Sequence, residues 1–304
     1  MERLFGHIDW LLVGATLLLV GAGLVTMNSF VDTNPFFERQ IIWTAVSLLV
    51  FFFLALVDYR FLKRTTIITG LFLGTAVVLG LLFVIGSVFM GAQSWFDFGL
   101  LAFQPSDPAK LVVILVLAKY FSRRHVEIAQ VRHILISGAY TFVIFALVFL
   151  QPDFGSAIII GALWFGMVLV SGISKKHLLG VLGIGLVSAL GLWTFVFEDY
   201  QKERVMTFLN PYTDIQGAGY NAYQSTVAVG SGQLLGKGIG YGTQSKLSFL
   251  PEYETDFIFA AFAEEWGLVG VLLICALFAL VIWRIIRIAA QGQSNFEMLF
   301  GAGL

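Results

Sequence analysis

The chain has 304 residues, of which 58% are hydrophobic and 12% are charged, and its mean hydropathy is +0.88. This composition lies outside the range of soluble globular proteins and indicates an integral membrane protein. The formal net charge of −1 is uninformative, and the lone Cys275 excludes a disulfide within the chain.

Apolar stretches account for most of the predicted elements. A span needs roughly 20 residues to cross about 30 Å of hydrocarbon. We therefore expect an all-α polytopic membrane protein, a single domain over residues 1–304, with about eight complete spans. A short stretch, 108–121, is counted as a span although it contains Lys110, and Asn295–Leu304 is expected to begin a ninth span. The other stretches are 8–30, 40–57, 66–90, 133–150, 155–172, 178–197 and 266–283.

Basic residues mark one side of the membrane. Nearly all of them outside the longest loop fall in the N-terminus or in alternate short loops, and only Arg39 lies in a short loop of opposite parity. By the positive-inside rule we expect the N-terminus to be cytoplasmic and the loop 198–255 to face outward, and we expect the first span to be an uncleaved signal anchor. The basic residues are Arg3, Arg60, Lys63, Arg64, Arg123, Arg124, Arg132, Lys175, Lys176, Arg284 and Arg287.

The span at 108–121 opens from the outside with a charged pair. Asp107 and Lys110 are three residues apart and share one helix face. They form either an ion pair that holds the helix end or part of a functional cleft, because ionisable residues that enter an apolar span tend to mark sites.

A tight turn expected at 151–157 places the carboxylate of Asp153 on the same, outward membrane face as Asp256. Asp153 is followed by Gly155, a pattern typical of an Asx turn that caps the next helix. Asp153 is therefore either a cap or a substrate-binding group.

The outward loop 198–255 is long, rich in aromatic residues and glycines, and expected to be ordered as a lid or re-entrant segment. Arg204, Gln224 and Lys237 supply polar groups. Lys237 lies between two glycines, but the spacing is one residue too short for a phosphate-binding P-loop. A glycine turn carrying one cation remains compatible with a lipid phosphate.

The loop ends in an acidic segment that leads into the last complete span. Thr255 is expected to cap a helix, which would place Asp256 in its first turn, where the positive helix end favours a carboxylate. The helix is expected to run straight past Trp266. Glu264 and Glu265 adjoin that tryptophan and are interpreted as solvated charges at headgroup level, with binding of Lys110 or a metal ion as the alternative.

Several segments together resemble the SEDS family of bacterial cell-wall proteins (shape, elongation, division and sporulation), and most closely its RodA branch. They occur in family order over essentially the whole chain. The matching segments are Gln104–Asp107 with Lys110, Gln151–Gly155, Arg204 with Phe208–Pro211, Gly219–Asn221 with Gln224 and Ser225, Gly230–Gly232, Gly242–Ser245, and Phe249–Glu252 with Thr255–Ala260, Glu264, Glu265 and Gly267.

The resemblance implies a peptidoglycan glycosyltransferase that polymerises lipid II outside the bacterial cytoplasmic membrane during elongation, partnered by a class B penicillin-binding transpeptidase. Asp256 would be the catalytic base. Lys110, Arg204 or Lys237, or a divalent cation such as Mg²⁺ or Mn²⁺, would stabilise the leaving pyrophosphate of the polyprenyl lipid. Asp153 and Gln224 would contact substrate.

The chain departs from the family pattern at Asp107, where the family usually has Glu, at Ser94, where it has a basic residue, and at Glu254, where it commonly has His. The family's final spans are expected to be missing here. A lipid-linked-precursor flippase and a non-catalytic scaffold for the transpeptidase are the alternative functions. We expect no nucleotide, haem, zinc or nucleic acid, and the spacing of His7, His125, His133 and His177 does not match zinc ligands.

Overall fold

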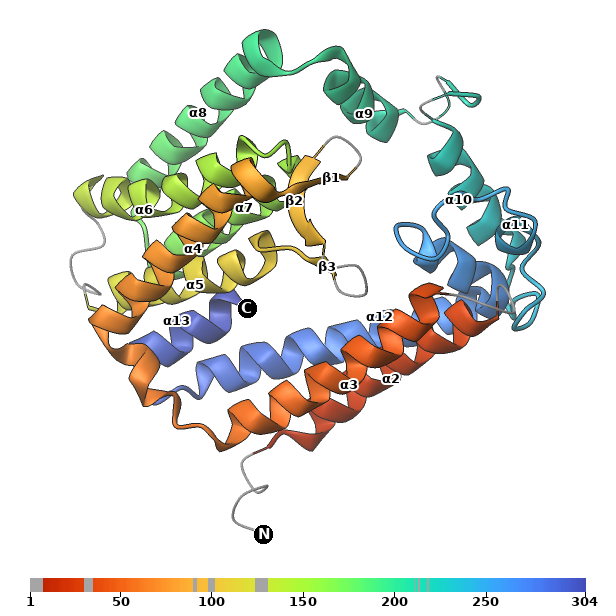
Figure 1. The fold of residues 1–304 in the computed structure, drawn as a ribbon, viewed down its shortest axis with the longest axis horizontal. Helices are drawn as coiled ribbons and strands as arrows, with labels where there is room; N and C mark the ends of the chain where they lie inside the picture. Colours follow the sequence, from red (N-terminus) through yellow and green to blue (C-terminus); the bar gives the residue numbers. More distant parts are fainter. Residues whose placement is uncertain are drawn as a thin grey trace. The chain divides into compact units, whose positions relative to one another are not determined.

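The structure, a computed structural model, describes residues 8–29, 35–89, 92–97, 102–123, 131–210, 212, 214–217 and 219–304 (Figure 1). Arg3, His7, Arg124, His125 and Pro211 of the sequence patterns lie outside these residues. The chain divides into two compact units, residues 1–57 with 187–284 and residues 58–186 with 285–304.

The first unit begins with a pair of apolar helices, α2 (Trp10–Asn28) and α3 (Pro35–Leu56), which lie side by side (Figure 1). Asp9 caps α2, because its Oδ1 accepts a hydrogen bond from the backbone N–H of Leu12 at 3.1 Å. Its Oδ2 accepts a second bond from Arg284 Nε at 2.8 Å. That ion pair ties the start of α2 to the far end of α12 (Ile258–Ala290).

The loop 198–255 of the first unit contains three helices among its described residues. These helices are α9 (Asp199–Leu209), α10 (Tyr220–Ser231) and α11 (Thr243–Lys246). The π-helical turn η2 (Leu192–Val196) precedes the loop. The side chains of Ala228, Leu250 and Ala260 are buried against one another, so α10 and the end of the loop pack on the start of α12.

The second unit is a helical group centred on α5 (Ser106–Ser122). The consecutive residues Val113, Ile114 and Leu115 are all buried, so more than one face of α5 is covered, as expected of a helix that is surrounded by neighbours. Its neighbours are α4 (Thr65–Ile85), α6 (Val131–Phe149), α7 (Phe154–Val170) and α13 (Asn295–Gly303). The 3₁₀ turn η1 (Tyr59–Lys63) precedes α4, and α8 (Lys175–Gly191) follows α7.

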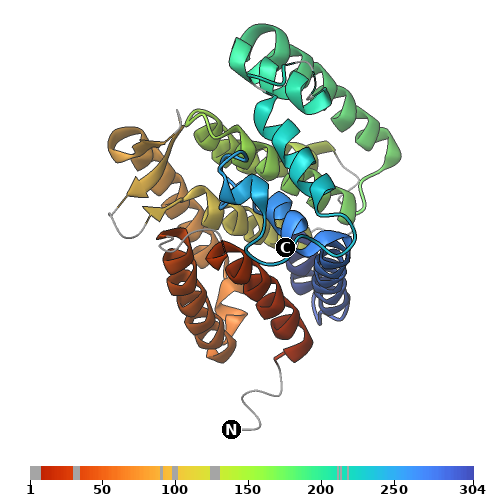
Figure 2. The ribbon, with the colours of Figure 1, turned by 90° about the vertical axis from the view of Figure 1, so that its right-hand side faces the viewer.

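A small sheet, which the sequence did not predict, follows α4 (Figure 2). It has the antiparallel order β1 (Ser87–Phe89), β2 (Ala92–Asp97) and β3 (Ala102–Phe103). The span expected at 66–90 therefore ends at Ile85, because the chain after Gly86 pairs as a strand. Trp95 and Phe96 are residue types that favour strands.

Each predicted span falls on a helix, and the all-α membrane fold is confirmed. Within the part of the chain that the structure describes, six helices are long and apolar enough to cross a membrane, and α7 is a shorter apolar helix. The stretch at 108–121 is α5, which has 17 residues. The six are α2, α3, α4, α6, α8 together with η2, and α12.

The start of α12 differs from the expectation. Thr255 does not cap a helix; residues 251–257 form turns, and α12 begins at Ile258. The carbonyl of Glu252 accepts hydrogen bonds from the backbone N–H groups of Thr255 (3.2 Å) and Phe257 (3.0 Å), which closes the turn before a helix can start. Asp256 is therefore an exposed turn residue rather than a first-turn helical residue.

Candidate functional site

The helix α12 is not straight, because it is interrupted at Gly267, where φ is +63° and ψ is −168°. Backbone groups near the interruption pair with the glycine-rich loop 232–240 instead of with their own helix. The four bonds run from Lys237 N to Glu264 O (3.0 Å), from Gly238 N to Glu265 O (3.0 Å), from Leu268 N to Gln233 O (2.9 Å) and from Val269 N to Leu234 O (3.1 Å). The loop thus satisfies polar groups that the interruption exposes.

Two glycines permit this close approach. A Cβ atom at Gly232 would lie 2.1 Å from the carbonyl oxygen of Ala263, and one at Gly236 would lie 2.0 Å from that of Glu265. Gly236 also has a φ of +80°, which favours glycine. The glycines that superficially suggested a phosphate loop therefore dock the loop against α12.

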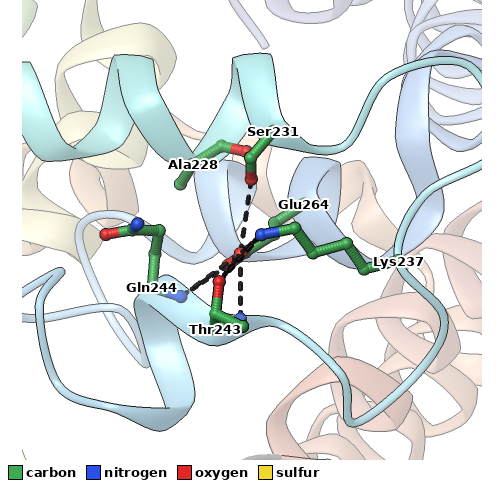
Figure 3. Close-up of polar contacts among 6 residues, drawn as sticks. All are labelled: Ala228, Ser231, Lys237, Thr243, Gln244 and Glu264. Atoms are coloured by element: carbon green, nitrogen blue, oxygen red, sulfur yellow. Dashed lines mark hydrogen bonds and ion pairs between the residues drawn. The ribbon is translucent and has the colours of Figure 1, made fainter.

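We call the contact region between α12 and the segment 231–246 the junction. The carboxylate of Glu264 lies at its centre and is completely buried (Figure 3). One of its oxygens, Oε1, collects hydrogen bonds from two backbone and three side-chain donors of α10, α11 and the loop between them. The donors are Lys237 Nζ (2.6 Å), Thr243 N (2.9 Å), Thr243 Oγ1 (3.0 Å), Gln244 N (3.2 Å) and Ser231 Oγ (3.3 Å).

Glu265 is buried beside it, with a relative exposure of 1%. Its Oε1 accepts hydrogen bonds from Ser29 Oγ at 2.6 Å and from the backbone N–H of Gly240 at 2.8 Å. The interpretation of both glutamates as solvated headgroup charges is therefore wrong, because the loop 232–246 covers them. The signal in the sequence was a pair of glutamates next to Gly267 and a glycine-rich loop with one lysine.

Lys237 belongs to this junction. Its ammonium donates to Glu264 and, at 2.8 Å, to Thr243 Oγ1, and its side chain is 29% exposed. A lipid phosphate at Lys237 would have to compete with a buried carboxylate for the same ammonium. The other polar residues expected in the loop lie elsewhere in this unit: Arg204 is exposed on α9, and Gln224 is half-buried on α10.

The acidic turn that carries Asp256 is attached to the junction through Leu250. The backbone N–H of Leu250 donates to the carbonyl of Gln244 at 3.0 Å, and its side chain is fully buried. Partly buried Tyr253 and Phe257 pack against the same cluster. Asp256 thus lies on an exposed turn whose two flanks are anchored.

The turn holds two further carboxyl groups. Burial, together with the nearby charge of Glu252, raises the pKa of Glu254 above its ordinary value. Thr255 Oγ1 donates to Glu252 Oε2 at 2.9 Å, which keeps Glu252 on this turn. The turn therefore concentrates negative charge around Asp256.

The expected pair of Asp107 and Lys110 is present in the second unit. Lys110 Nζ lies 2.8 Å from Asp107 Oδ1, with side chains that are 21% and 63% exposed, respectively. Because Asp107 is mostly exposed, the pair is only partly desolvated and its net energy resembles that of a surface pair.

Asp153 takes the capping role that the sequence allowed. Its Oδ1 accepts from the backbone N–H of Ser156 at 3.1 Å, at the start of α7. Its Oδ2 accepts from Gln104 Nε2 at 2.9 Å and from Ser106 Oγ at 3.3 Å, so it also ties α7 to the start of α5. Both oxygens serve the packing of the second unit.

Among the described residues, no three His, Cys, Asp or Glu side chains come together as ligands for a metal ion. A divalent cation near Asp256 therefore stays a prediction. The expected absence of a zinc site is likewise a prediction from the sequence.

Comparisons with known proteins identify the family. The family FtsW/RodA/SpoVE, described as cell cycle protein, matches residues 4–304. The peptidoglycan glycosyltransferase MrdB of Escherichia coli (strain K12) is 38% identical over 289 residues, which cover 94% of this chain and 77% of MrdB. The stage V sporulation protein E of Bacillus subtilis (strain 168) is 35% identical, over 97% of this chain and 83% of that protein.

The fold is also similar to solved structures. A chain from a peptidoglycan synthase complex, studied for the coordination of polymerization and crosslinking, matches with a TM-score of 0.81 and 30% identity, over 98% of this chain and 82% of that one. The rod shape determining protein RodA of Thermus thermophilus matches with a TM-score of 0.70 and 27% identity, over 98% and 80%.

The fold and these similarities define a predominantly helical, polytopic membrane protein of the kind that the RodA-like resemblance implied. The chain belongs to the FtsW/RodA/SpoVE family of cell cycle proteins.

Proposed function

We propose that the chain is a peptidoglycan glycosyltransferase that polymerises lipid II into glycan strands on the outer face of the bacterial cytoplasmic membrane during elongation. Family membership supports the activity, since MrdB, at 38% identity, is a peptidoglycan glycosyltransferase. The structural observation that carries the assignment to a site is the exposed carboxylate of Asp256 on a turn anchored by Leu250.

In this reaction Asp256 takes the proton of the acceptor sugar hydroxyl as that oxygen attacks the anomeric carbon of the donor. The new glycosidic C–O bond forms while the bond from that carbon to the pyrophosphate oxygen breaks, and the polyprenyl pyrophosphate leaves with the electron pair. Positive charge near the pyrophosphate stabilises the leaving group. Arg204 on α9 and Lys110 on α5 are the candidate cations, with Mg²⁺ or Mn²⁺ as a further source of charge.

Of the three cations expected for this role, Lys237 is the least suited, because its ammonium pairs with the completely buried carboxylate of Glu264, whereas the partner of Lys110, Asp107, is mostly exposed. Asp153 is likewise better explained as a cap than as a substrate contact, since both its oxygens accept hydrogen bonds within the protein. Gln224, half-buried on α10, stays a proposed substrate contact.

A class B penicillin-binding transpeptidase is the proposed partner. The similarity to a chain of a peptidoglycan synthase complex that couples polymerization and crosslinking supports this pairing. The proposed orientation has a cytoplasmic N-terminus and an outward loop 198–255, and it rests on the one-sided placement of basic residues such as Arg284 and Arg287.

The activity is tested with purified lipid II and the protein in lipid nanodiscs, alone and with a class B transpeptidase. Glycan strands longer than the substrate are the expected product, separated by gel electrophoresis. Binding of lipid II without any polymer, under both conditions, would favour a precursor flippase or a scaffold instead.

A further inference from the structure

The buried carboxylate of Glu264 is explained by no step of the proposed reaction. It is completely buried and lies six helical residues beyond the start of α12. A buried charge is tolerated only where it is paired and hydrogen-bonded. Lys237 supplies the opposite charge, and the backbone N–H groups of Thr243 and Gln244 supply donors that have no helical partner at the start of α11.

Hydrogen bonds connect Glu264 to the turn of Asp256 in two steps. Glu264 Oε2 accepts from Gln244 N at 3.1 Å, and the carbonyl of the same residue, Gln244, accepts from the backbone N–H of Leu250 at 3.0 Å. Leu250 is fully buried and immediately precedes the turn that begins at Pro251. The position of the first residue of the turn therefore depends on the position of Gln244.

The far end of the turn is fixed by α12 itself. Phe257 N donates to Glu252 O, and Ala260 N and Ala261 N donate to Phe257 O at 2.9 and 3.2 Å, so the turn continues directly into the helix. Glu264 lies one helical turn after Ala260, on the same helix. The carboxylate of Glu264 lies on the helix that follows the turn, and it holds the segment 244–250 that precedes the turn.

We infer that Glu264 is the positioning residue for Asp256, and that Lys237 serves to neutralise and hold Glu264 rather than to bind a lipid phosphate. This inference rests on the proposed catalytic role of Asp256. Loss of the Glu264 carboxylate strands the Lys237 ammonium and two backbone N–H groups, which releases the loop 243–250 and shifts the turn. A displacement of about 1 Å at a reacting group can slow turnover by ~10²-fold.

The test uses four variants in nanodiscs: Glu264→Ala, Glu264→Gln, Lys237→Met and, as the matched control, Glu203→Ala, whose carboxylate is exposed on α9. Each is measured for kcat and KM with lipid II and for amide hydrogen exchange by mass spectrometry. Glu264→Ala is expected to lower kcat by ~10²-fold with KM unchanged. Exchange is expected to accelerate in peptides over 243–257 and to stay unchanged in α6.

Glu264→Gln is expected to recover part of the lost kcat, because its amide oxygen can still accept from Thr243 and Gln244 at the Oε1 position. Lys237→Met should reproduce the kcat and exchange effects of the Glu264 variants. A rise in KM for Lys237→Met, with normal exchange over 243–257, would instead show that Lys237 holds the lipid phosphate and would overturn the inference. Glu264→Ala with the kcat and exchange of Glu203→Ala would overturn it as well.

Asp256→Asn, measured beside these variants, separates this inference from the proposed function. Wild-type turnover of Asp256→Asn would refute the catalytic role of Asp256, and with it any catalytic reason for positioning that residue. Slow turnover of Asp256→Asn, combined with Glu264→Ala at the rate of Glu203→Ala, would leave the proposed function intact and refute the positioning role alone.

Discussion

Replacement of Lys237 by Met should destabilise the first unit by leaving Glu264 as an unpaired buried charge. Breaking a fully buried ion pair by removing one partner costs ~3–5 kcal/mol. Glu264 is completely buried, but Lys237 is 29% exposed, and the carboxylate keeps its bonds to Ser231, Thr243 and Gln244. We therefore expect the lower end of that range, about 3 kcal/mol.

The double variant Lys237→Met/Glu264→Gln provides the sharper measurement. It removes both charges of the ion pair, so no unpaired carboxylate is left buried. The double variant should therefore be less destabilised than Lys237→Met alone, and the destabilisations of the two single variants should not add. Unfolding in detergent, followed by circular dichroism, gives the free energies, with Lys176→Met, an exposed lysine at the start of α8, as the control. Equal stability of Lys237→Met and Lys176→Met, or simple additivity in the double variant, would refute this reasoning.

Three further outcomes are expected. Burial and the charge of Glu252 raise the pKa of Glu254, so the neutral form of this carboxyl is favoured in the folded state. The stability that Glu254 contributes is therefore present below its ordinary pKa and is lost as pH rises through its raised folded pKa. Glu254→Gln should consequently raise the thermal midpoint at pH 7 and not at pH 4, and an equal effect at both would contradict the assignment. Lys110→Met should cost no more than ~1 kcal/mol of stability, because Asp107 is 63% exposed, yet should reduce polymerisation more than exposed Arg123→Met; equal activity of the two would mean that Lys110 only extends to the headgroups. In a Cys275→Ser background, a cysteine at exposed Gln216 should react with an impermeant thiol reagent added outside and one at exposed Lys176 should not; the reverse pattern would overturn the topology.

The spans could be predicted because each is a long apolar run whose environment, the hydrocarbon, is uniform. Local patterns also gave the Asp107–Lys110 pair and the cap at Asp153, since both depend on residues close in sequence. The sheet after α4 was missed because its strands are only three, six and two residues long, too short for an alternating pattern to stand out from the apolar span that precedes them.

The junction could not be derived from local patterns, because its contacts join distant segments. Lys237 and Glu264 are 27 residues apart, and Ser29 and Glu265 are 236 residues apart. Thr255 looked like a cap because it precedes an apolar helix, but the carbonyl of Glu252 and the buried side chain of Leu250 fix a turn there instead. The nearest available signal was the cluster of glycines at 232, 236 and 267, which marks a close approach of backbones.

The most direct test of the proposed mechanism is the rate of glycan-strand formation from lipid II by Asp256→Asn. This substitution keeps the size of the side chain and removes the basic lone pair, so turnover should fall by ~10²–10⁴-fold, while amide exchange over 251–257 stays as in the wild-type protein. Polymerisation at the wild-type rate would contradict the catalytic role of Asp256.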